Sequence, residues 1–344
     1  MKIAVFGGTG SLGSNFVRYA LERGDVEPVV YSTAGAGAGN RPAHSVEVRA
    51  YPANDPETIV FDDDTEAVVN FAHPWERRGG IDGGEQIERF AKLVAAARRR
   101  QPSLRLVHVS SMSVFEPFRS AHPFSETDPL DPPAGDVYAR EKVLAETALR
   151  ALPDADRWQL HLRPTVVYGP YCAAWTDRLL AAFRRGNVDY WDLSGSIQPV
   201  YGEDLSRFVH ERLHDFTPGI YNFPGPEKVS WQAFVDTFRE IVGVGELVRV
   251  PAGARDETPN APGIVERAVT KAARTLRPAA AAAAAGRRTN ATLLTRSFFA
   301  VDRLLSDAAL RRDFPTFRRA APSEVKAELA AYYRDRFAGD VEQR

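Results

Sequence analysis

Short apolar runs rich in β-branched residues alternate with longer amphipathic stretches through the first half of the chain. The runs predict strands and the stretches predict helices, an order that is typical of βαβ units in a parallel sheet. The runs VVNFA and LVHVSS are continuously hydrophobic, as expected of strands buried on both faces. We therefore predict an α/β fold with a Rossmann-like, doubly wound parallel sheet. The predicted strands lie at 3–6, 27–32, 66–72, 105–111 and 160–168, and the predicted helices at 15–24, 86–100 and 138–152.

The pattern becomes less regular after Tyr168. A strand at 197–201 and a helix at 203–213 are expected to return to the first lobe, and the later helical patterns predict a second, smaller lobe. Alanine is the strongest helix former, so the run at 279–285 predicts a surface helix interrupted at Gly286. We expect a dinucleotide-binding Rossmann domain over 1–168 plus 197–224, and a C-terminal substrate-binding lobe over 169–196 plus 225–344.

Charge and composition narrow the class of partner. The 344 residues include 44 basic and 45 acidic side chains, so the net charge is −1 and no overall field would draw the chain to nucleic acid or an anionic membrane. We expect a small-molecule substrate, no nucleic-acid partner and no membrane partner. No signal peptide or membrane-length apolar run is found, and the single cysteine, Cys172, cannot form an intramolecular disulfide. No Cys/His cluster shows metal-ligand spacing. These features predict a cytoplasmic protein without a metal site, and they are compatible with a homodimer.

The sequence GGTGSLG follows the first predicted strand and opens a helix. Such a turn lets the backbone approach a pyrophosphate at the positive end of the helix, and its last glycine allows the helix to pack closely on the strand. An ordinary glycine-rich turn is the alternative, but this position at the first βα junction favours dinucleotide binding. The expected binding residues in the turn are Gly7, Thr9, Gly10, Ser11, Leu12 and Gly13.

The end of the second predicted strand bears on the choice of cofactor. A carboxylate at this position would accept hydrogen bonds from the ribose hydroxyls of NAD and repel the 2′-phosphate of NADP. This chain has Ser32 there, with Arg41 in the glycine-rich segment that follows. We expect NADP, with NAD as the alternative, since Ser32 could also cap a turn and Arg41 could be solvated.

The sequence YAREK places Tyr138 and Lys142 four residues apart on one face of a predicted helix. A free tyrosine is a poor base at neutral pH because its pKa is about 10, and a fixed ammonium neighbour stabilises its phenolate. A surface pair is the alternative for this spacing alone. The preceding strand ends in Ser110, Ser111 and Ser113 at the expected ligand-binding edge, where one hydroxyl could donate to a substrate carbonyl and where serines also form turns.

The motifs GGTGSLG, VVNFA, SSMSVF, YAREK and LRPTVVYGP stand in this order over roughly the first two-thirds of the chain. Together they resemble the extended short-chain dehydrogenase/reductases, also called the NAD-dependent epimerase/dehydratase family. The resemblance implies an enzyme with Ser111, Tyr138 and Lys142 as catalytic residues. It also implies that Asn70, Phe71 and Ala72 wall the cofactor with His73 at the edge of this wall. Lys142 is expected to hold the cofactor ribose, and Pro164 and Thr165 to lie near the nicotinamide.

At three places the sequence departs from the family pattern, and these differences reduce the number of expected reactions. Nucleotide-sugar enzymes of the family usually have asparagine where this chain has Val166, and arginine where it has Pro199. The dehydratases carry an Asp-Glu pair where this chain has Met112 and Ser113. We therefore expect hydride transfer at a secondary alcohol or ketone of a small metabolite, sugar-like compounds included. The alternatives are a nucleotide-sugar 4-epimerase and a non-catalytic NAD(P)-binding sensor, although a sensor would be expected to lose the tyrosine.

Overall fold

The computed structural model describes residues 1–33, 46–51, 58–73, 83–118, 122–249, 291–294 and 297–342. At its centre lies a seven-stranded sheet with the order β11-β6-β5-β4-β1-β2-β3, in which all neighbouring strands run parallel. This arrangement confirms the predicted Rossmann-like, doubly wound sheet. The strands are β1 (Lys2–Phe6), β2 (Glu27–Ser32), β3 (Glu47–Ala50), β4 (Thr65–Asn70), β5 (Arg105–Val109), β6 (Gln159–Pro164) and β11 (Gly219–Phe223).

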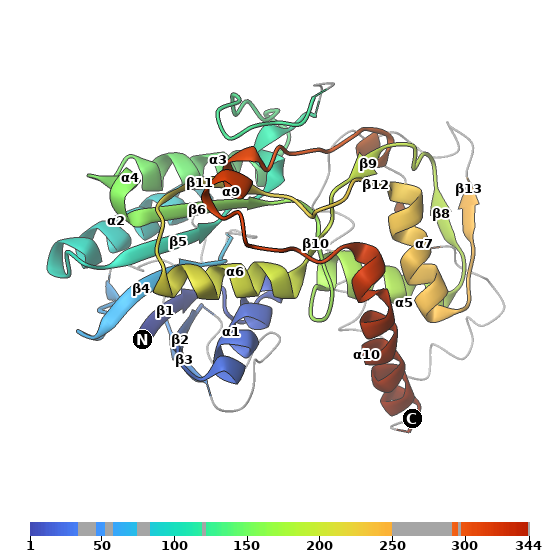
Figure 1. Cartoon of the computed structure of the whole chain (residues 1–344), viewed down its shortest axis with the longest axis horizontal. Coiled ribbons are helices and arrows are strands. Elements are labelled where there is room, and N and C mark those ends of the chain that lie inside the picture. The colour runs from blue at the N-terminus through green and yellow to red at the C-terminus, as the bar shows by residue number, and fades with distance from the viewer. Residues whose placement is uncertain are drawn as a thin grey trace.

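Helices cover both faces of this sheet (Figure 1). One face packs against α1, α6 and α9, and the other against α2, α3 and α4, and each interface encloses a buried apolar cluster. Such two-sided burial explains why the central strands are apolar throughout rather than alternating. The helices are α1 (Ser11–Arg23), α2 (Gly83–Arg100), α3 (Val137–Arg150), α4 (Ala155–Trp158), α6 (Gly202–His214) and α9 (Ala308–Asp313).

Parallel pairing brings the carboxyl ends of the strands to one edge of the sheet. The register aligns Phe6 with Asn70, Asn70 with His108, and His108 with His161. The glycine-rich turn after β1, the loop after β4 and the serines after β5 therefore lie along the same edge. Open α/β sheets bind their ligands at this edge.

The second half of the chain adds an aromatic-rich region beside the sheet, on the right of Figure 1. Its core includes Trp231 and Phe238, neither of which has any exposed area, and it also takes in Met112 and Val166 from the sheet side. The division into two domains at the expected boundaries stays a prediction. The remaining helices are α5 (Arg178–Arg185), α7 (Trp231–Val242) and α10 (Pro322–Glu342), and the remaining strands are β7 (Val167–Tyr168), β8 (Val188–Tyr190), β9 (Ser196–Ile197), β10 (Val200–Tyr201), β12 (Val229–Ser230), β13 (Leu247–Arg249) and β14 (Ala291–Leu294).

The predicted strand at 197–201 is wrong as a single element. Its two ends form β9 and β10, which belong to different sheets, β9 pairing with β12 and β10 with β7. Pro199 lies between them and has no N–H to donate to a ladder, so a continuous strand is interrupted there. The predicted helix after this segment is confirmed as α6, which lies beside α1.

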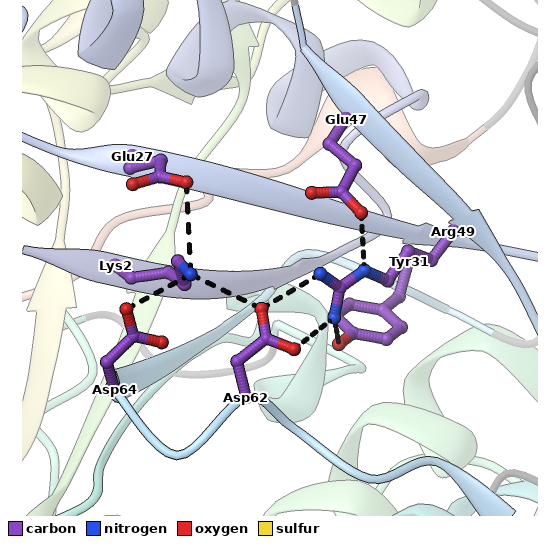
Figure 2. A network of polar contacts seen from close by, with 7 residues as sticks. All are labelled: Lys2, Glu27, Tyr31, Glu47, Arg49, Asp62 and Asp64. Carbon is purple, nitrogen blue, oxygen red and sulfur yellow. Dashed lines mark hydrogen bonds and ion pairs between the residues drawn. The ribbon is translucent and has the colours of Figure 1, made fainter.

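A network of charged side chains ties the edge strand β3 to the rest of the sheet (Figure 2). The guanidinium of Arg49 donates to both carboxylate oxygens of Asp62 at 2.7 and 2.8 Å and to Glu47 at 2.7 Å. Lys2 lies 3.4 Å from Asp62 and 3.1 Å from Asp64. The network therefore joins β3, the start of β1 and the segment before β4. The paired guanidinium lowers the pKa of Asp62 to about 2.

Two expectations fall outside the described residues: the position of Arg41 and the helix at 279–285. Among the described helices, none has both the length and the apolar character needed to cross a bilayer.

Candidate cofactor and active site

The glycine-rich turn after β1 has the backbone shape that its sequence predicts. Gly7 adopts a left-handed φ of 74°, and a Cβ there would lie 2.6 Å from the backbone nitrogen of Ala72. A Cβ on Gly13 would collide with the carbonyl oxygen of Gly7. Gly10 is exposed, and a Cβ there would meet only the Gly7 carbonyl oxygen, at 3.2 Å. Two of the glycines thus allow close packing of the turn, whereas Gly10 keeps its outer surface open.

The N-terminus of α1 fits an anionic group. Its N-cap is Gly10, no side chain accepts a hydrogen bond from the first-turn amides, and the first turn contains no acidic residue. The unpaired amides and the helix dipole make such an end favourable for a phosphate. The Ser11 hydroxyl faces another way, because it donates to the carbonyl of Tyr171 at 2.6 Å and accepts from the amide of Ala173 at 2.9 Å. The hydroxyl of Ser11 is therefore engaged elsewhere, and only its backbone amide is available to a phosphate at the helix N-terminus.

The loop after β4 contacts the glycine turn directly. The Phe71 amide donates to the carbonyl of Phe6 at 2.9 Å, and the Ala72 amide donates to the side-chain oxygen of Asn70 at 2.9 Å. The Asn70 amide group in turn lies 3.1 Å from His108 Nδ1. Asn70 therefore fixes the backbone of Phe71 and Ala72 beside Gly7, where the sequence analysis predicts the cofactor wall.

Ser32 ends β2 at the same edge of the sheet. It is buried, with 6% of its surface exposed, and its carbonyl accepts from the amide of Tyr51. Its position next to the end of β1 agrees with the place where an adenosine-ribose contact is expected.

Tyr138 and Lys142 lie one turn apart near the start of α3, as predicted. Asp136 caps this helix by accepting a hydrogen bond from the Ala139 amide. The cap places Tyr138 in the first turn of the helix. The Lys142 ammonium donates to the carbonyl of Val109 at 3.1 Å and lies 5.9 Å from the centre of the Tyr138 ring. Burial lowers the pKa of Lys142 to about 8, although Glu146 and Glu141 act to raise it. Lys142 is therefore mostly protonated at neutral pH.

His73 joins this pair from the loop after β4. Its Nε2 lies 3.1 Å from a carboxylate oxygen of Glu141, and its ring meets the Tyr138 ring edge to face with centroids 4.7 Å apart. Burial lowers the pKa of His73 to about 4; the Glu141 hydrogen bond opposes this effect and the Lys142 charge adds to it. His73 is thus neutral at physiological pH and packs directly on the tyrosine.

Ser111 lies at the start of a short 3-10 helix, Met112–Phe115, that packs against α3. Its hydroxyl accepts from the Ser113 amide at 3.2 Å and lies 3.3 Å from the Ser113 hydroxyl. The neighbouring Ser110 instead donates to Glu146. The Ser111 hydroxyl thus takes part in the turn, and the buried Ser110 hydroxyl binds Glu146.

A buried ion pair joins β6 to α3 beside the Tyr138–Lys142 pair. Arg163 on β6 donates to Glu146 on α3 through both Nε and Nη2, with the shortest contact 2.6 Å, and both side chains are almost fully buried. The pair keeps the pKa of Glu146 below its ordinary value despite burial. Pro164 and Thr165 follow directly, and the Thr165 hydroxyl donates to the carbonyl of Gln198.

Neither Glu141 nor Glu146 was predicted from the sequence as a site residue, and Asn70 was expected only as part of the cofactor wall. The spacing of Glu141 and Glu146 within α3 places them near Lys142, but their partners His73 and Arg163 come from other elements. Only the three-dimensional fold reveals these pairs.

The fold and the site define the Rossmann class that binds dinucleotides. The defining features are the parallel α/β sheet, the open glycine turn at the N-terminus of α1, and the helix with Tyr138 and Lys142 at the carboxyl edge of the sheet. A family model described as the NAD dependent epimerase/dehydratase family matches residues 3–222. The chain belongs to this family, as the sequence motifs predict.

One sequence relative and several solved structures are similar to this chain. A dTDP-4-dehydrorhamnose reductase from Burkholderia thailandensis is 29% identical over 283 residues, which cover 74% of this chain and 86% of the relative. A dTDP-glucose 4,6-dehydratase from Bacillus anthracis, crystallised with NAD, has a TM-score of 0.69 at 17% identity, covering 97% of each chain. A UDP-glucose 4-epimerase from Thermotoga maritima, crystallised with UDP-glucose, has a TM-score of 0.69 at 15% identity, covering 98% of this chain and 100% of that one. At these identities the structures establish a shared fold.

Proposed function

We propose that this protein is an NADP(H)-dependent oxidoreductase that interconverts a ketone and a secondary alcohol on a small, sugar-like metabolite. The observation that carries this proposal is the position of Tyr138. Its ring is fixed by His73 and lies near the protonated Lys142, at the sheet edge that also carries the open glycine turn. Tyr138 can exchange a proton there with a bound substrate.

The residues at this edge fit a dinucleotide. The amides at the start of α1 suit a pyrophosphate, Gly10 leaves the approach open, and Phe71 and Ala72 form a wall beside the turn. When bound, a nicotinamide cofactor supplies or accepts a hydride. In this proposal the remaining contacts come from Thr9, Leu12, Ser32, Arg41, His73, Lys142, Pro164 and Thr165.

The preference for NADP rests on Ser32. Its hydroxyl does not repel a 2′-phosphate, whereas a carboxylate at the end of β2 would. The family membership itself supports a nicotinamide cofactor. We assign NADP(H) as the preferred form and NAD(H) as the alternative.

The proton chemistry follows from three side chains. In the reductive direction the Tyr138 hydroxyl transfers its proton to the substrate carbonyl oxygen, and the Lys142 ammonium stabilises the phenolate that remains. The Ser111 hydroxyl turns from Ser113 to donate a hydrogen bond to the same oxygen. In the oxidative direction each transfer is reversed, and the phenolate accepts the alcohol proton.

Three features favour reduction or oxidation over the other reactions of the family. The relative from Burkholderia thailandensis is named as a reductase. The residues after Ser111 are a buried methionine, Met112, and a serine engaged in the turn, so they supply no acid-base pair for eliminating water. Val166 and Pro199 also depart from the nucleotide-sugar pattern, which weighs against a 4-epimerase.

The test measures net nicotinamide turnover with a panel of ketones, alcohols and nucleotide sugars, for the wild type and for Tyr138→Phe. We expect substrate-dependent oxidation of NADPH by the wild type, and loss of nearly all turnover in Tyr138→Phe with little change in cofactor affinity. Tyr221→Phe is the control, because Tyr221 on β11 belongs to the cluster under α1, α6 and α9, and its hydroxyl donates to Asp313 at the end of α9. Inversion of a sugar centre without net nicotinamide change would establish an epimerase instead. Cofactor binding without turnover of any substrate would favour a sensor.

A further inference from the structure

A compact group of metal-binding side chains lies away from the proposed active site. Asp25 stands in the short connection between α1 and β2, and His210 and His214 are one turn apart at the end of α6. His210 Nε2 lies 2.7 Å from Asp25 Oδ1, and His214 Nε2 lies 3.2 Å from Asp25 Oδ2. One ligand atom from each residue falls within 4.8 Å of the other two. A single carboxylate thus faces two imidazole nitrogens.

The position of this group separates it from the cofactor. Asp25 precedes the amino end of β2, whereas the glycine turn follows the carboxyl end of β1, its parallel neighbour. The group therefore lies at the amino-terminal edge of the sheet, where the contacts of Asp25 join the residues after α1 to the C-terminal end of α6. An ion bound here would have no contact with the proposed reaction.

The donor atoms match a borderline divalent transition ion. Imidazole nitrogen and carboxylate oxygen are common ligands of Zn²⁺, at distances of about 2.0–2.2 Å. Tetrahedral ligands at such distances lie about 3.4 Å from one another. The observed 2.7 and 3.2 Å separations would need to widen by less than about 1 Å to admit the ion.

The surroundings also favour a cation with an open coordination position. The carbonyl ends of two helices carry partial negative charge, and Asp25 adds a full one. Side-chain exposure is 50% for Asp25 and 42% for His214, but only 7% for His210. His210 gives the site a fixed inner ligand, and water can reach the ion from the outer side.

We propose that Asp25, His210 and His214 form a three-ligand binding site for Zn²⁺, with water as the fourth ligand. The ion replaces the direct contacts of the Asp25 carboxylate with the His210 and His214 imidazoles. It fastens the α1–β2 connection to the end of α6 and so stabilises the packing of these two helices. No metal site was expected from the sequence, because Asp25 lies 185 residues before its first histidine partner.

The test titrates chelator-treated protein with zinc chloride by calorimetry and follows thermal unfolding. We expect one Zn²⁺ per chain and a rise in Tm on the order of a few degrees at saturating zinc. Magnesium chloride should leave Tm unchanged, because Mg²⁺ prefers oxygen ligands. Cobalt(II) should give the strong visible absorption of a tetrahedral site. Absence of stoichiometric zinc binding would show that the three residues form ion pairs only, and would overturn the proposal.

Variants identify the ligands. Loss of even an outer partner of a metal ligand typically weakens affinity about 10–100-fold, so His214→Gln and Asp25→Asn should each weaken zinc binding at least that much. Both replaced side chains are substantially exposed, which limits the effect on folding. His122→Gln, at an exposed histidine outside the group, is the matched control and should bind zinc like the wild type. Equal zinc affinity in all three variants would place the ion elsewhere.

Discussion

The Nε2 atom of His73 lies 3.1 Å from a carboxylate oxygen of Glu141, and this contact joins the loop after β4 to helix α3. Glu141 is three residues after Tyr138, so the same contact places the imidazole against the tyrosine ring. Because burial keeps the pKa of His73 at about 4, the neutral ring donates its Nε2 hydrogen to Glu141 at physiological pH. His73 is therefore a positioning residue for Tyr138.

Replacing His73 by alanine should lower kcat by roughly one to two orders of magnitude, because the Tyr138 ring loses its support. KM should change much less, and the dissociation constant of the cofactor should rise only by the loss of the one wall contact expected from His73. Glu141→Gln is the matched variant, since its amide oxygen can still accept the Nε2 hydrogen and most activity should remain. Steady-state kinetics and cofactor titration measure both effects. A His73→Ala enzyme with wild-type kcat would show that the contact does not orient the tyrosine.

Gly13→Ala and Gly10→Ala should separate stability from cofactor binding. A Cβ on Gly13 collides with the Gly7 carbonyl, so this variant should lose about 1–3 kcal/mol of stability as the turn shifts. A Cβ on Gly10 at the helix N-terminus meets only the Gly7 carbonyl oxygen, at 3.2 Å, so Gly10→Ala should keep most of its stability and lose cofactor affinity. Denaturant unfolding and cofactor titration of both variants provide the measurement. The interpretation fails if Gly10→Ala binds the cofactor as tightly as the wild type.

Ser32→Asp should shift the preference from NADP toward NAD by about 1–3 kcal/mol, the scale of charged hydrogen bonds gained or lost. The carboxylate would accept from the ribose hydroxyls and repel a 2′-phosphate. Affinities for both cofactors are compared at one ionic strength, because salt screens the phosphate interaction. Ser32→Asn is a neutral control of similar size, and thermal unfolding checks that the buried position tolerates each change. A strong NAD preference of the wild type would contradict the assignment of NADP.

Acid should destabilise the protein before its carboxylates protonate. Burial lowers the pKa of His73 and of His161 to about 4, and that of His108 well below its ordinary value. Above a pH of about 6.5 neither the folded nor the unfolded chain protonates these rings, so the full stability is present. Between about pH 6.5 and 4 the unfolded chain takes up protons that the folded chain does not, and the free energy of unfolding falls by up to about 1.4 kcal/mol per pH unit for each histidine.

Denaturant unfolding at a series of pH values over this range measures the slope. His161→Phe removes one of the titrating rings and should make the slope shallower by about one proton. Stability that is constant down to pH 5 would show that these rings protonate equally in both states.

The parts of the fold that could be predicted from the sequence are those that depend on neighbouring residues. The strands β1, β4 and β5 follow from short apolar runs, the glycine turn from residues 7–13, and the Tyr138–Lys142 pair from helical periodicity. The short β11 was not predicted as a strand, because its identity depends on pairing with β6, some 60 residues earlier.

The supporting contacts of the candidate site needed the structure for the same reason. His73 and Glu141 are 68 residues apart, and nothing in either local sequence specifies the other. At 197–201 the local sequence predicted too much structure. Its apolar residues suggested one strand, whereas a proline divides the segment between two sheets. Local patterns thus locate the elements and the glycine turn, and tertiary packing determines which side chains meet.

The two outermost strands of the central sheet, β3 and β11, affect whether the sheet can pair with a second molecule. An exposed strand edge can recruit a strand from another molecule and begin aggregation. Strand β3 is only four residues long and carries Glu47 and Arg49 within the charged network of Figure 2, while β11 at the other edge contacts α9. A second molecule adding to β3 would have to desolvate these charges. Arg49 and its partners therefore act against intermolecular sheet extension as well as holding β3 in place.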